Sequence, residues 1–188
     1  MSLADNVHIM TNKELNGLAQ NRFIDSDIQM EIAVHPYRRS REYLAENPSI
    51  TTAVRDVLWD HRGYVLKTLL VQAGHYREEL NRYRELYESS HSRWSKASWR
   101  LGYTFISGYW GHSSPGANFT PSDLLNDIYD DFVGPADHAY IQYYKSYQLK
   151  GLANHPNCDT KLAIKLSQHE DPEIQKLGFS RLVSLQKT

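Results

Sequence analysis

The sequence predicts an all-α protein, and three observations support this fold class. Apolar residues recur at steps of three and four, as in Leu124, Ile128 and Phe132, which is the period of an amphipathic helix. Helix start signals stand before several of these stretches. No segment shows the alternation of apolar and polar residues that is typical of a strand. We therefore expect helical hairpins and no sheet.

Two capping signals open the first predicted helices. Thr11 stands three residues before Glu14, and Ser26 stands three residues before Gln29. This spacing lets the paired side chains satisfy free amide groups in the first turn of a helix. We therefore expect helices in "NKELNGLA" and in "IQMEIAVH".

Prolines and glycines set the limits of the next helices. Pro36 ends the second helix, because a proline forces the residue before it out of the helical region. A short helix is expected from about Arg38 to Glu46, ended by Asn47-Pro48. Two further apolar stripes follow, with a turn at Asp60 to Gly63 between them, and Gly74 is a suitable C-terminal stop.

The middle of the chain is rich in aromatic residues, since most of the thirteen Tyr and four Trp lie between Tyr76 and Tyr147. The segment "HYREELNRYRELYE" spaces Tyr76, Leu80, Tyr83 and Tyr87 by four, three and four residues, which indicates a helix with one aromatic face. The segment "GYTFISGYWGHSSPGANF" carries four Gly and a Pro, which predicts a loop with aromatic anchors. Such anchors can form a binding loop or can pack under it into the core.

The last third of the chain again shows clear helix starts. Thr120 and Pro121 suit the cap and first position of a helix, because the missing proline amide costs nothing there. A helix is expected in "ADHAYIQYYKSYQLKGLA". Asp159 then caps "TKLAIKLS", and Asp171-Pro172 opens the final helix.

Two segments of the chain are similar to each other. Residues 44–66 and 152–175 both begin with a Leu-Ala pair and carry a Pro four residues after the Leu. Both also have an apolar residue ten positions after that Pro, Leu58 in the first segment and Leu166 in the second. The two segments therefore look like copies of one helical unit.

This pattern resembles helical repeats of the HEAT and armadillo type, in particular the leucine-rich repeat variants. The residues that carry the resemblance are Leu44, Ala45, Asn47, Pro48, Leu58 and Val65 in one copy, and Leu152, Ala153, Pro156, Leu166, Asp171, Pro172 and Ile174 in the other. The resemblance implies hairpins that bury their apolar stripes against neighbours and present a rigid surface to macromolecules.

The two copies stand apart in the sequence, whereas arrays stack contiguous units. The interval from Pro48 to Pro156 divides into three equal steps of repeat length, and Pro121 lies near one of the intermediate positions. Either the middle units have diverged, or an aromatic helical insertion separates two end units; an ordinary helical bundle is the third alternative. We predict one domain over 1–188, with repeat-like units at about 41–73 and 150–185 and a divergent middle at 75–149.

Composition limits the function classes. A formal charge of -1 gives no overall argument for a nucleic-acid binder, which is usually basic. The single cysteine, Cys158, cannot form an internal disulfide, and we expect it to be packed and unreactive. No apolar run is long enough to span a bilayer, and the N-terminus lacks the pattern of a secretory signal. We expect a cytoplasmic protein without a membrane partner.

The sequence lacks the strong enzymatic motifs for zinc, phosphate or an activated serine. We therefore predict no enzyme activity and no cofactor. His35 and His155 each precede a Pro, and His61 and His169 stand in turns between helices. Capping or turn roles are expected for all four.

An acidic group offers the best candidate metal site. Asp127 and Asp131 are one helical turn apart, with Asp130 beside them and Asp137 and His138 further on. Oxygen ligands of this kind suit Mg or Mn. The alternative is a solvated polar face, and we predict that no metal binds here. A metal-dependent hydrolase is the least favoured function.

Two basic clusters and one loop combine arginine or lysine with aromatic residues. The candidate partner-binding residues are Tyr37, Arg38, Arg39, Arg41, Arg93, Trp94, Lys96, Trp99, Arg100, Tyr109 and Trp110. Arginine with aromatic rings holds phosphates and stacks bases, and it also forms hot spots of protein interfaces. Because the net charge is near zero, we predict a non-enzymatic protein-protein adaptor or regulator, with a nucleic-acid-binding protein as the alternative.

Overall fold

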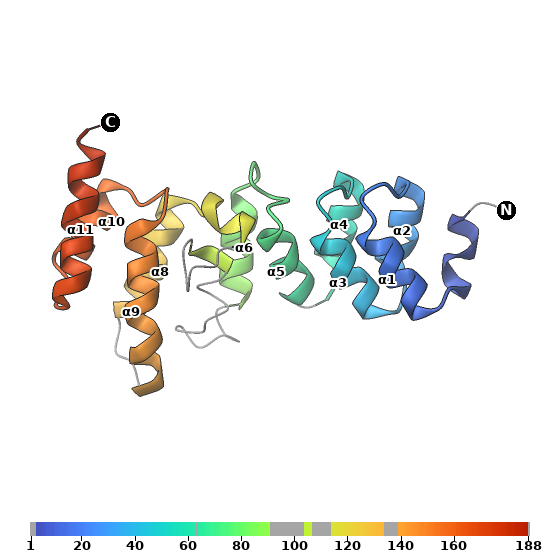
Figure 1. Cartoon of the computed structure of the whole chain (residues 1–188), viewed down its shortest axis with the longest axis horizontal. Helices are drawn as coiled ribbons and strands as arrows, with labels where there is room; N and C mark the ends of the chain where they lie inside the picture. Colours follow the sequence, from blue (N-terminus) through green and yellow to red (C-terminus); the bar gives the residue numbers. More distant parts are fainter. Residues whose placement is uncertain (1–2, 63, 91–103, 107–113, 134–138, 188) are drawn as a thin grey trace. The chain divides into compact units, whose positions relative to one another are not determined.

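The computed structural model describes residues 3–62, 64–90, 104–106, 114–133 and 139–187. Within these ranges the regular structure is entirely helical, with no strand (Figure 1). The predicted all-α class is therefore confirmed. No helix among these residues is long and apolar enough to cross a membrane.

The chain divides into two compact units, Met1–His75 and Tyr76–Thr188. The prediction of one domain over the whole chain stays a prediction.

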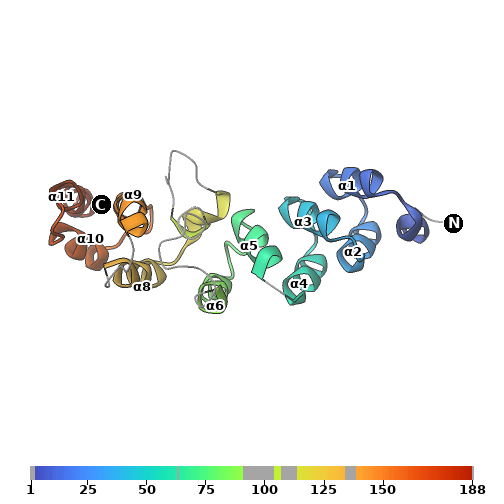
Figure 2. The same ribbon diagram turned by 90° about the horizontal axis from the view of Figure 1, so that it is seen from below.

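The first unit is a two-layer array of short helices. Its elements are η1 (Ala4–Ile9), α1 (Asn12–Gln20), α2 (Ser26–Val34), α3 (Arg38–Glu46), α4 (Thr52–Asp60) and α5 (Tyr64–Gln72). From α1 to α5 each helix packs against the next one and the next but one. Figure 2 shows the result, with α1, α3 and α5 in one layer and α2 and α4 in the other.

This array repeats with a constant step along the sequence. Helices α1, α3 and α5 begin at Asn12, Arg38 and Tyr64, and α2 and α4 begin at Ser26 and Thr52, so every second helix starts at the same interval. All five helices are nine residues long. This interval between alternate helix starts is shorter than one third of the distance from Pro48 to Pro156. The repeat length suggested by the prolines therefore does not apply to the first unit.

A sequence signal for the shorter step exists and was missed. The stretch "LAQN" at residues 18–21 precedes "LAEN" at residues 44–47 by the same interval as the helix starts. Ala19 and Ala45 are fully buried near the ends of α1 and α3, where a small side chain permits close approach of neighbouring helices. Leu44, Leu58 and Leu70 are also fully buried and fill the space between the layers.

Side-chain caps begin α1 and α4, whereas α2 and α3 begin without a side-chain cap bond. Thr11 and Glu14 form the predicted capping box, in which the Glu14 carboxylate accepts the Thr11 amide at 2.8 Å. The second predicted box is wrong, because Asp25 precedes α2 and makes no side-chain cap bond. Gln29 turns inward instead: it donates to the Ser49 carbonyl at 3.2 Å and accepts the Thr51 amide at 3.0 Å.

The second unit contains α6 (Asn81–Ser90), η3 (Pro115–Phe119), α8 (Ser122–Val133), α9 (Ala139–Asn154), α10 (Thr160–Ser167) and α11 (Pro172–Leu185). Helices α8 to α11 follow the packing rule of the first unit, each against the next and the next but one. In Figure 2, α9 and α11 form one layer and α8 and α10 the other.

Most of the described aromatic residues of the middle region belong to the core, whereas Phe119 is 37% exposed. Tyr83 and Tyr87 meet the ring of Phe105 edge-on, with centroids 6.5 and 5.8 Å apart. The Tyr83 hydroxyl donates to the Gly116 carbonyl at 2.8 Å. The predicted helix is shorter than expected, since α6 begins only at Asn81 and residues 76–80 lie outside it.

The two similar segments take the same local structure. The first runs from the end of α3 through α4 into α5, and the second from the end of α9 through α10 into α11. Thr51 and Asp159 cap α4 and α10, and Tyr64 and Pro172 begin α5 and α11. Both pairs have the same separation along the chain as the two landmark prolines, so the register of the sequence match is also the register of the structure.

Candidate interaction site

Four of the predicted site residues lie at the start of α3, in the first unit. They are Tyr37, Arg38, Arg39 and Arg41. The other seven, Arg93, Trp94, Lys96, Trp99, Arg100, Tyr109 and Trp110, lie outside the described residues. The geometry of the candidate site is therefore that of the α3 end.

The turn from α2 into α3 is held by its own side chains. His35 follows α2, and its Nδ1 accepts the Tyr37 amide at 3.1 Å. Ser40, which is fully buried, donates to the Tyr37 carbonyl at 2.8 Å. These bonds fix the backbone of Tyr37 and so set the direction in which Arg38 and Arg39 leave the helix.

Arg38 and Arg39 are exposed and share one acidic partner. Their side chains are 68% and 59% exposed, and they reach the Glu42 carboxylate at 2.6 and 3.4 Å. Arg39 also lies over the ring of Tyr43, 5.0 Å from its centroid, and donates to the Tyr43 hydroxyl at 3.4 Å. The bond to Tyr43 raises the pKa of Arg39. The contacts with Tyr43 and Glu42 restrain its guanidinium.

Arg41 has a different role from its two neighbours. It is half-buried, and its guanidinium donates to the carbonyl of His35 at the end of α2. An arginine there satisfies a carbonyl that the helix leaves free, and it meets the negative end of the helix dipole. The structure thus separates two outward arginines from one that supports the turn.

The charge around this site is close to balanced. Glu42 lies between Arg38 and Arg39, and Glu46 is exposed one turn further along α3. Partial desolvation of its carboxyl nevertheless raises the pKa of Glu46, although the nearby Arg39 opposes this shift. The α3 end is therefore a mixed patch, and this differs from the uniformly positive surface that nucleic-acid backbones require.

Sequence reasoning missed Glu42 and Tyr43 as members of this site. Both belong to the helix predicted from Arg38 to Glu46, but the sequence pattern assigns them no role in binding. Their spacing was the available signal, because Tyr43 follows Arg39 by four residues and Glu42 follows Arg38 by four, and such pairs meet on one helical face.

The histidines singled out from the sequence hold turns together. His155 is fully buried; its Nδ1 accepts the Asn157 amide at 3.0 Å, and its Nε2 donates to the Ala117 carbonyl at 2.7 Å. Burial lowers the pKa of His155 to about 4, so the ring is neutral. His61 contacts the Ala33 carbonyl at 2.8 Å, and His169 accepts the Asp171 amide at 3.0 Å.

The acidic group on α8 is occupied by other side chains of the second unit. Asp127 pairs with Arg84 at 2.8 Å, and Asp130 pairs with Lys165 at 2.7 Å. Asp131 accepts a hydrogen bond from the Tyr87 hydroxyl. Asp137 and His138 lie outside the described residues, and no group of three metal-ligating side chains occurs among those that are described.

Cys158 is buried at the turn between α9 and α10, in agreement with the predicted packed position. Burial raises the pKa of its thiol to about 11, which leaves the thiol protonated. A protonated, enclosed thiol is a poor nucleophile and a poor metal ligand.

Comparison of the chain with protein-family models, with curated proteins and with solved structures finds no match. Among these candidate sites, the α3 end combines exposure, charge and contacts that restrain its arginines.

Proposed function

We propose that the chain is a non-enzymatic protein-binding adaptor or regulator and that the α3 end is part of its contact surface. The observation that carries this proposal is the exposed Arg39 guanidinium stacked on Tyr43, with the exposed Arg38 beside it. Arginine and tyrosine are among the residue types that most often anchor protein interfaces.

The fixed position of these arginines favours binding. Glu42 and Tyr43 already restrict Arg38 and Arg39 in the free protein. A restrained side chain loses less conformational entropy when a partner binds, so more of the contact energy appears as affinity. The turn bonds of His35 and Ser40 add to this by holding the backbone.

The mixed charge of the site favours a protein partner over a nucleic acid. Glu42 and Glu46 lie within the same patch and would repel a phosphate backbone. The nucleic-acid alternative remains the second hypothesis, and its strong salt dependence would distinguish it. The segment with Arg93, Trp94, Lys96, Trp99, Arg100, Tyr109 and Trp110 is kept as a further predicted part of the surface.

The resemblance to HEAT and armadillo repeats is also part of this proposal. It is supported by the two-layer packing of helices within each unit and by the common register of the two similar segments. Repeats of this kind present rigid surfaces to partners. We also propose a cytoplasmic location, supported by the single buried thiol in a chain that cannot form an internal disulfide.

Affinity capture with variants of the α3 end tests the proposal. The double variant Arg38→Glu with Arg39→Glu should lose proteins that the unchanged chain retains, because it reverses both outward charges. A matched control is Arg22→Glu with Arg77→Glu, which reverses two other exposed arginines. We expect the control to retain the same proteins, with and without nuclease.

Two outcomes would contradict the proposal. Equal retention by the α3 variant and the control would show that the α3 end is not a contact surface. Loss of all retained proteins after nuclease, together with retained nucleic acid, would favour the nucleic-acid alternative.

A further inference from the structure

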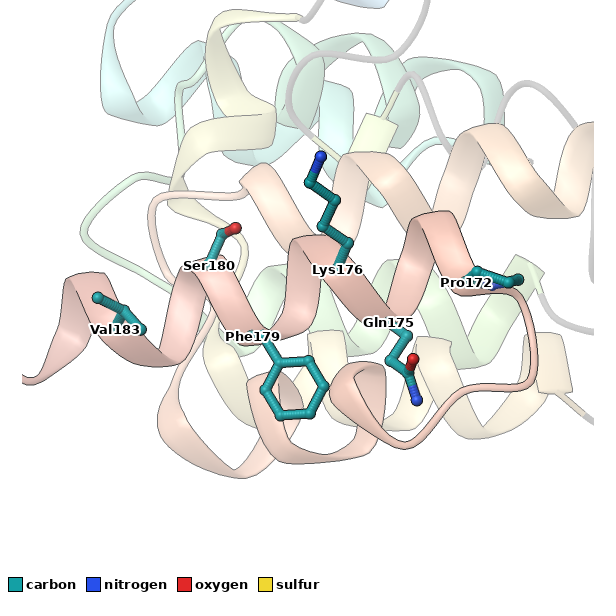
Figure 3. A pocket seen from close by; sticks show the side chains of 6 residues that line it. All are labelled: Pro172, Gln175, Lys176, Phe179, Ser180 and Val183. Carbon is teal, nitrogen blue, oxygen red and sulfur yellow. The ribbon is translucent and has the colours of Figure 1, made fainter.

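The outward face of α11 forms a shallow hollow on the second unit. It is lined by Pro172, Gln175, Lys176, Phe179, Ser180 and Val183. Figure 3 shows Lys176 and Ser180 on one side of the helix and Gln175 and Phe179 on the other. Phe179 and Val183 are one helical turn apart and are 54% and 51% exposed. Two large apolar side chains thus share a face that no described residue covers.

The first similar segment shows that this position can be enclosed. Phe179 corresponds to Val71 in the register common to the two segments, and Val71 is fully buried on α5. The same face is therefore covered in one copy and open in the other. Exposed apolar area of this kind is favourable to bury against a partner.

The lysines near this face indicate which kind of partner could bind it. Lys176 lines the same hollow and is exposed, and Lys187 is exposed just beyond the C-terminal end of α11. Neither lysine forms an ion pair with any residue in the described part of the chain. A partner that buries Phe179 and Val183 therefore needs apolar side chains and acidic groups on one helical face.

The first unit carries a face of that composition on α2. Asp27, Glu31 and Val34 follow one another at steps of four and three, so they share one side of the helix. Val34 is 57% exposed, and Phe23, in the turn that leads into α2, is 93% exposed. Asp27 and Glu31 are exposed and make no ion pair within the described ranges.

We infer that the chain associates with a second copy of itself, head to tail, through the α11 face of one copy and the α2 face of the other. In this contact Phe179 and Val183 pack with Val34 and Phe23. Lys176 faces the acidic groups of α2. The two faces differ, so each added copy leaves one face of each kind free, and association proceeds with concentration. This inference uses other residues than the α3 end and goes beyond the proposed adaptor function.

Sedimentation velocity over a range of protein concentrations tests the contact. The unchanged chain should shift from monomer to dimer and larger species as concentration rises. Phe179→Ser should weaken this association about tenfold or more, because it removes a central apolar anchor. Lys13→Glu, on the exposed face of α1, is a control that should leave the association unchanged.

A charge exchange makes the test specific for the two faces. Lys176→Glu and Glu31→Lys should each reduce self-association when studied alone, since each brings like charges together. An equimolar mixture of the two variants should recover it, because the acidic α11 face of one meets the altered α2 face of the other. Hydrogen exchange of each variant confirms that its helices remain formed.

Three results would overturn the inference. The unchanged chain could remain monomeric at every concentration, the variants could associate as the unchanged chain does, or the mixture could fail to recover association. None of these results bears on the α3 end, because Arg38 and Arg39 are intact in all of these variants. Failure of this inference is therefore distinguishable from failure of the proposed function.

Discussion

The two similar segments form equivalent hydrogen bonds with different residue types. In the first, Asn47 donates to the carbonyls of Ala19 and Asn21 at 2.8 and 3.0 Å and accepts the Ser49 amide at 3.0 Å. In the second, His155 and Asn157 divide these bonds between two side chains. Different residue types thus make equivalent hydrogen bonds in the two segments.

The two segments differ in their last helices, which are α5 in the first segment and α11 in the second. Leu70 is fully buried on α5, and the residue in the same register on α11 is Gly178. A Cβ on Gly178 would lie 2.6 Å from the carbonyl carbon of Leu166 and nearer still to the Ser167 amide nitrogen. Helix α11 therefore approaches α10 with its backbone, where α5 presents a large side chain.

The largest effect is expected from Gly178→Ala. The added methyl group meets backbone atoms that cannot rotate away, so we expect a loss of about 3 kcal/mol or more in the free energy of unfolding of the second unit. The control is Gly17→Ala, at an exposed helical position with nothing within 4 Å. It should stabilise the first unit by about 0.5 to 1 kcal/mol. Denaturant titrations measure both changes in the free energy of unfolding. If Gly178→Ala and Gly17→Ala change it equally, α10 and α11 do not pack as closely at Gly178 as described.

The next largest effect is a loss of stability of the second unit at acidic pH, caused by His155. Because the pKa of His155 is about 4 in the folded chain, below its ordinary value of 6.5, the unfolded chain takes up the proton first as pH falls. The stabilisation is complete above about pH 6.5 and is lost between there and pH 4, by up to about 3 kcal/mol. Protonation of Nδ1 would also break its bond to the Asn157 amide.

His155→Asn should remove most of this acid dependence in α9 and α10. Hydrogen exchange measured from pH 7.5 to pH 4.5 reports it segment by segment. Burial also lowers the pKa of His75 in the first unit, so part of the acid dependence of the whole chain should persist. An unchanged pH profile of α9 and α10 in the variant would contradict the role given to His155.

A smaller loss is expected from Asn47→Ala. It leaves the carbonyls of Ala19 and Asn21 without their donor in a region where Asn47 is 3% exposed, which costs about 2 kcal/mol. Asn47→His carries the side chain of the other segment and should recover part of this loss at pH 8 but not at pH 5. Thermal unfolding at the two pH values checks both variants, and equal stability of Asn47→Ala and the unchanged chain would contradict the prediction.

The smallest effects are expected at the helix caps. The Asp159 carboxylate accepts hydrogen bonds from the backbone amide of Leu162 at 2.8 Å and from the side-chain amide of Asn126 at 3.3 Å. The Thr51 hydroxyl accepts one from the backbone amide of Val54 at 3.4 Å. Asp159→Ala should therefore cost about 1 kcal/mol or more, and Thr51→Ala less than that. Chemical denaturation of the two variants measures the difference; a larger loss for Thr51→Ala would contradict the ranking.

Much of the fold could be predicted because its signals are local. Helix α3 runs from Arg38 to Glu46 as expected, and Asp159 and Asp171 cap α10 and α11. Such caps involve residues within three positions of each other, so the sequence contains both partners. Helix α8 begins at Ser122, one residue after the predicted start, for the same local reason.

Other predictions failed or fell short because the deciding partner is distant in the sequence. Gln29 was expected to cap its own helix, but it makes three hydrogen bonds elsewhere, two of them with the loop around Ser49 and Thr51. The sequence analysis treats Arg41 like Arg38 and Arg39. Its different role depends on its contact with the His35 carbonyl, which the sequence does not reveal. In the candidate site, the sequence predicts the arginines. It does not predict that the carboxylate of Glu42 offsets the positive charge of Arg38 and Arg39.

The sequence by itself determined the helical class, most helix limits and the common register of the two similar segments, because short-range caps and apolar periodicity decide these features. Only the tertiary structure decided the regular two-layer array of the first unit, the close approach at Gly178 and the difference between the open face of α11 and the buried Val71. These features depend on which helices pack together, and packing joins residues that no local pattern relates.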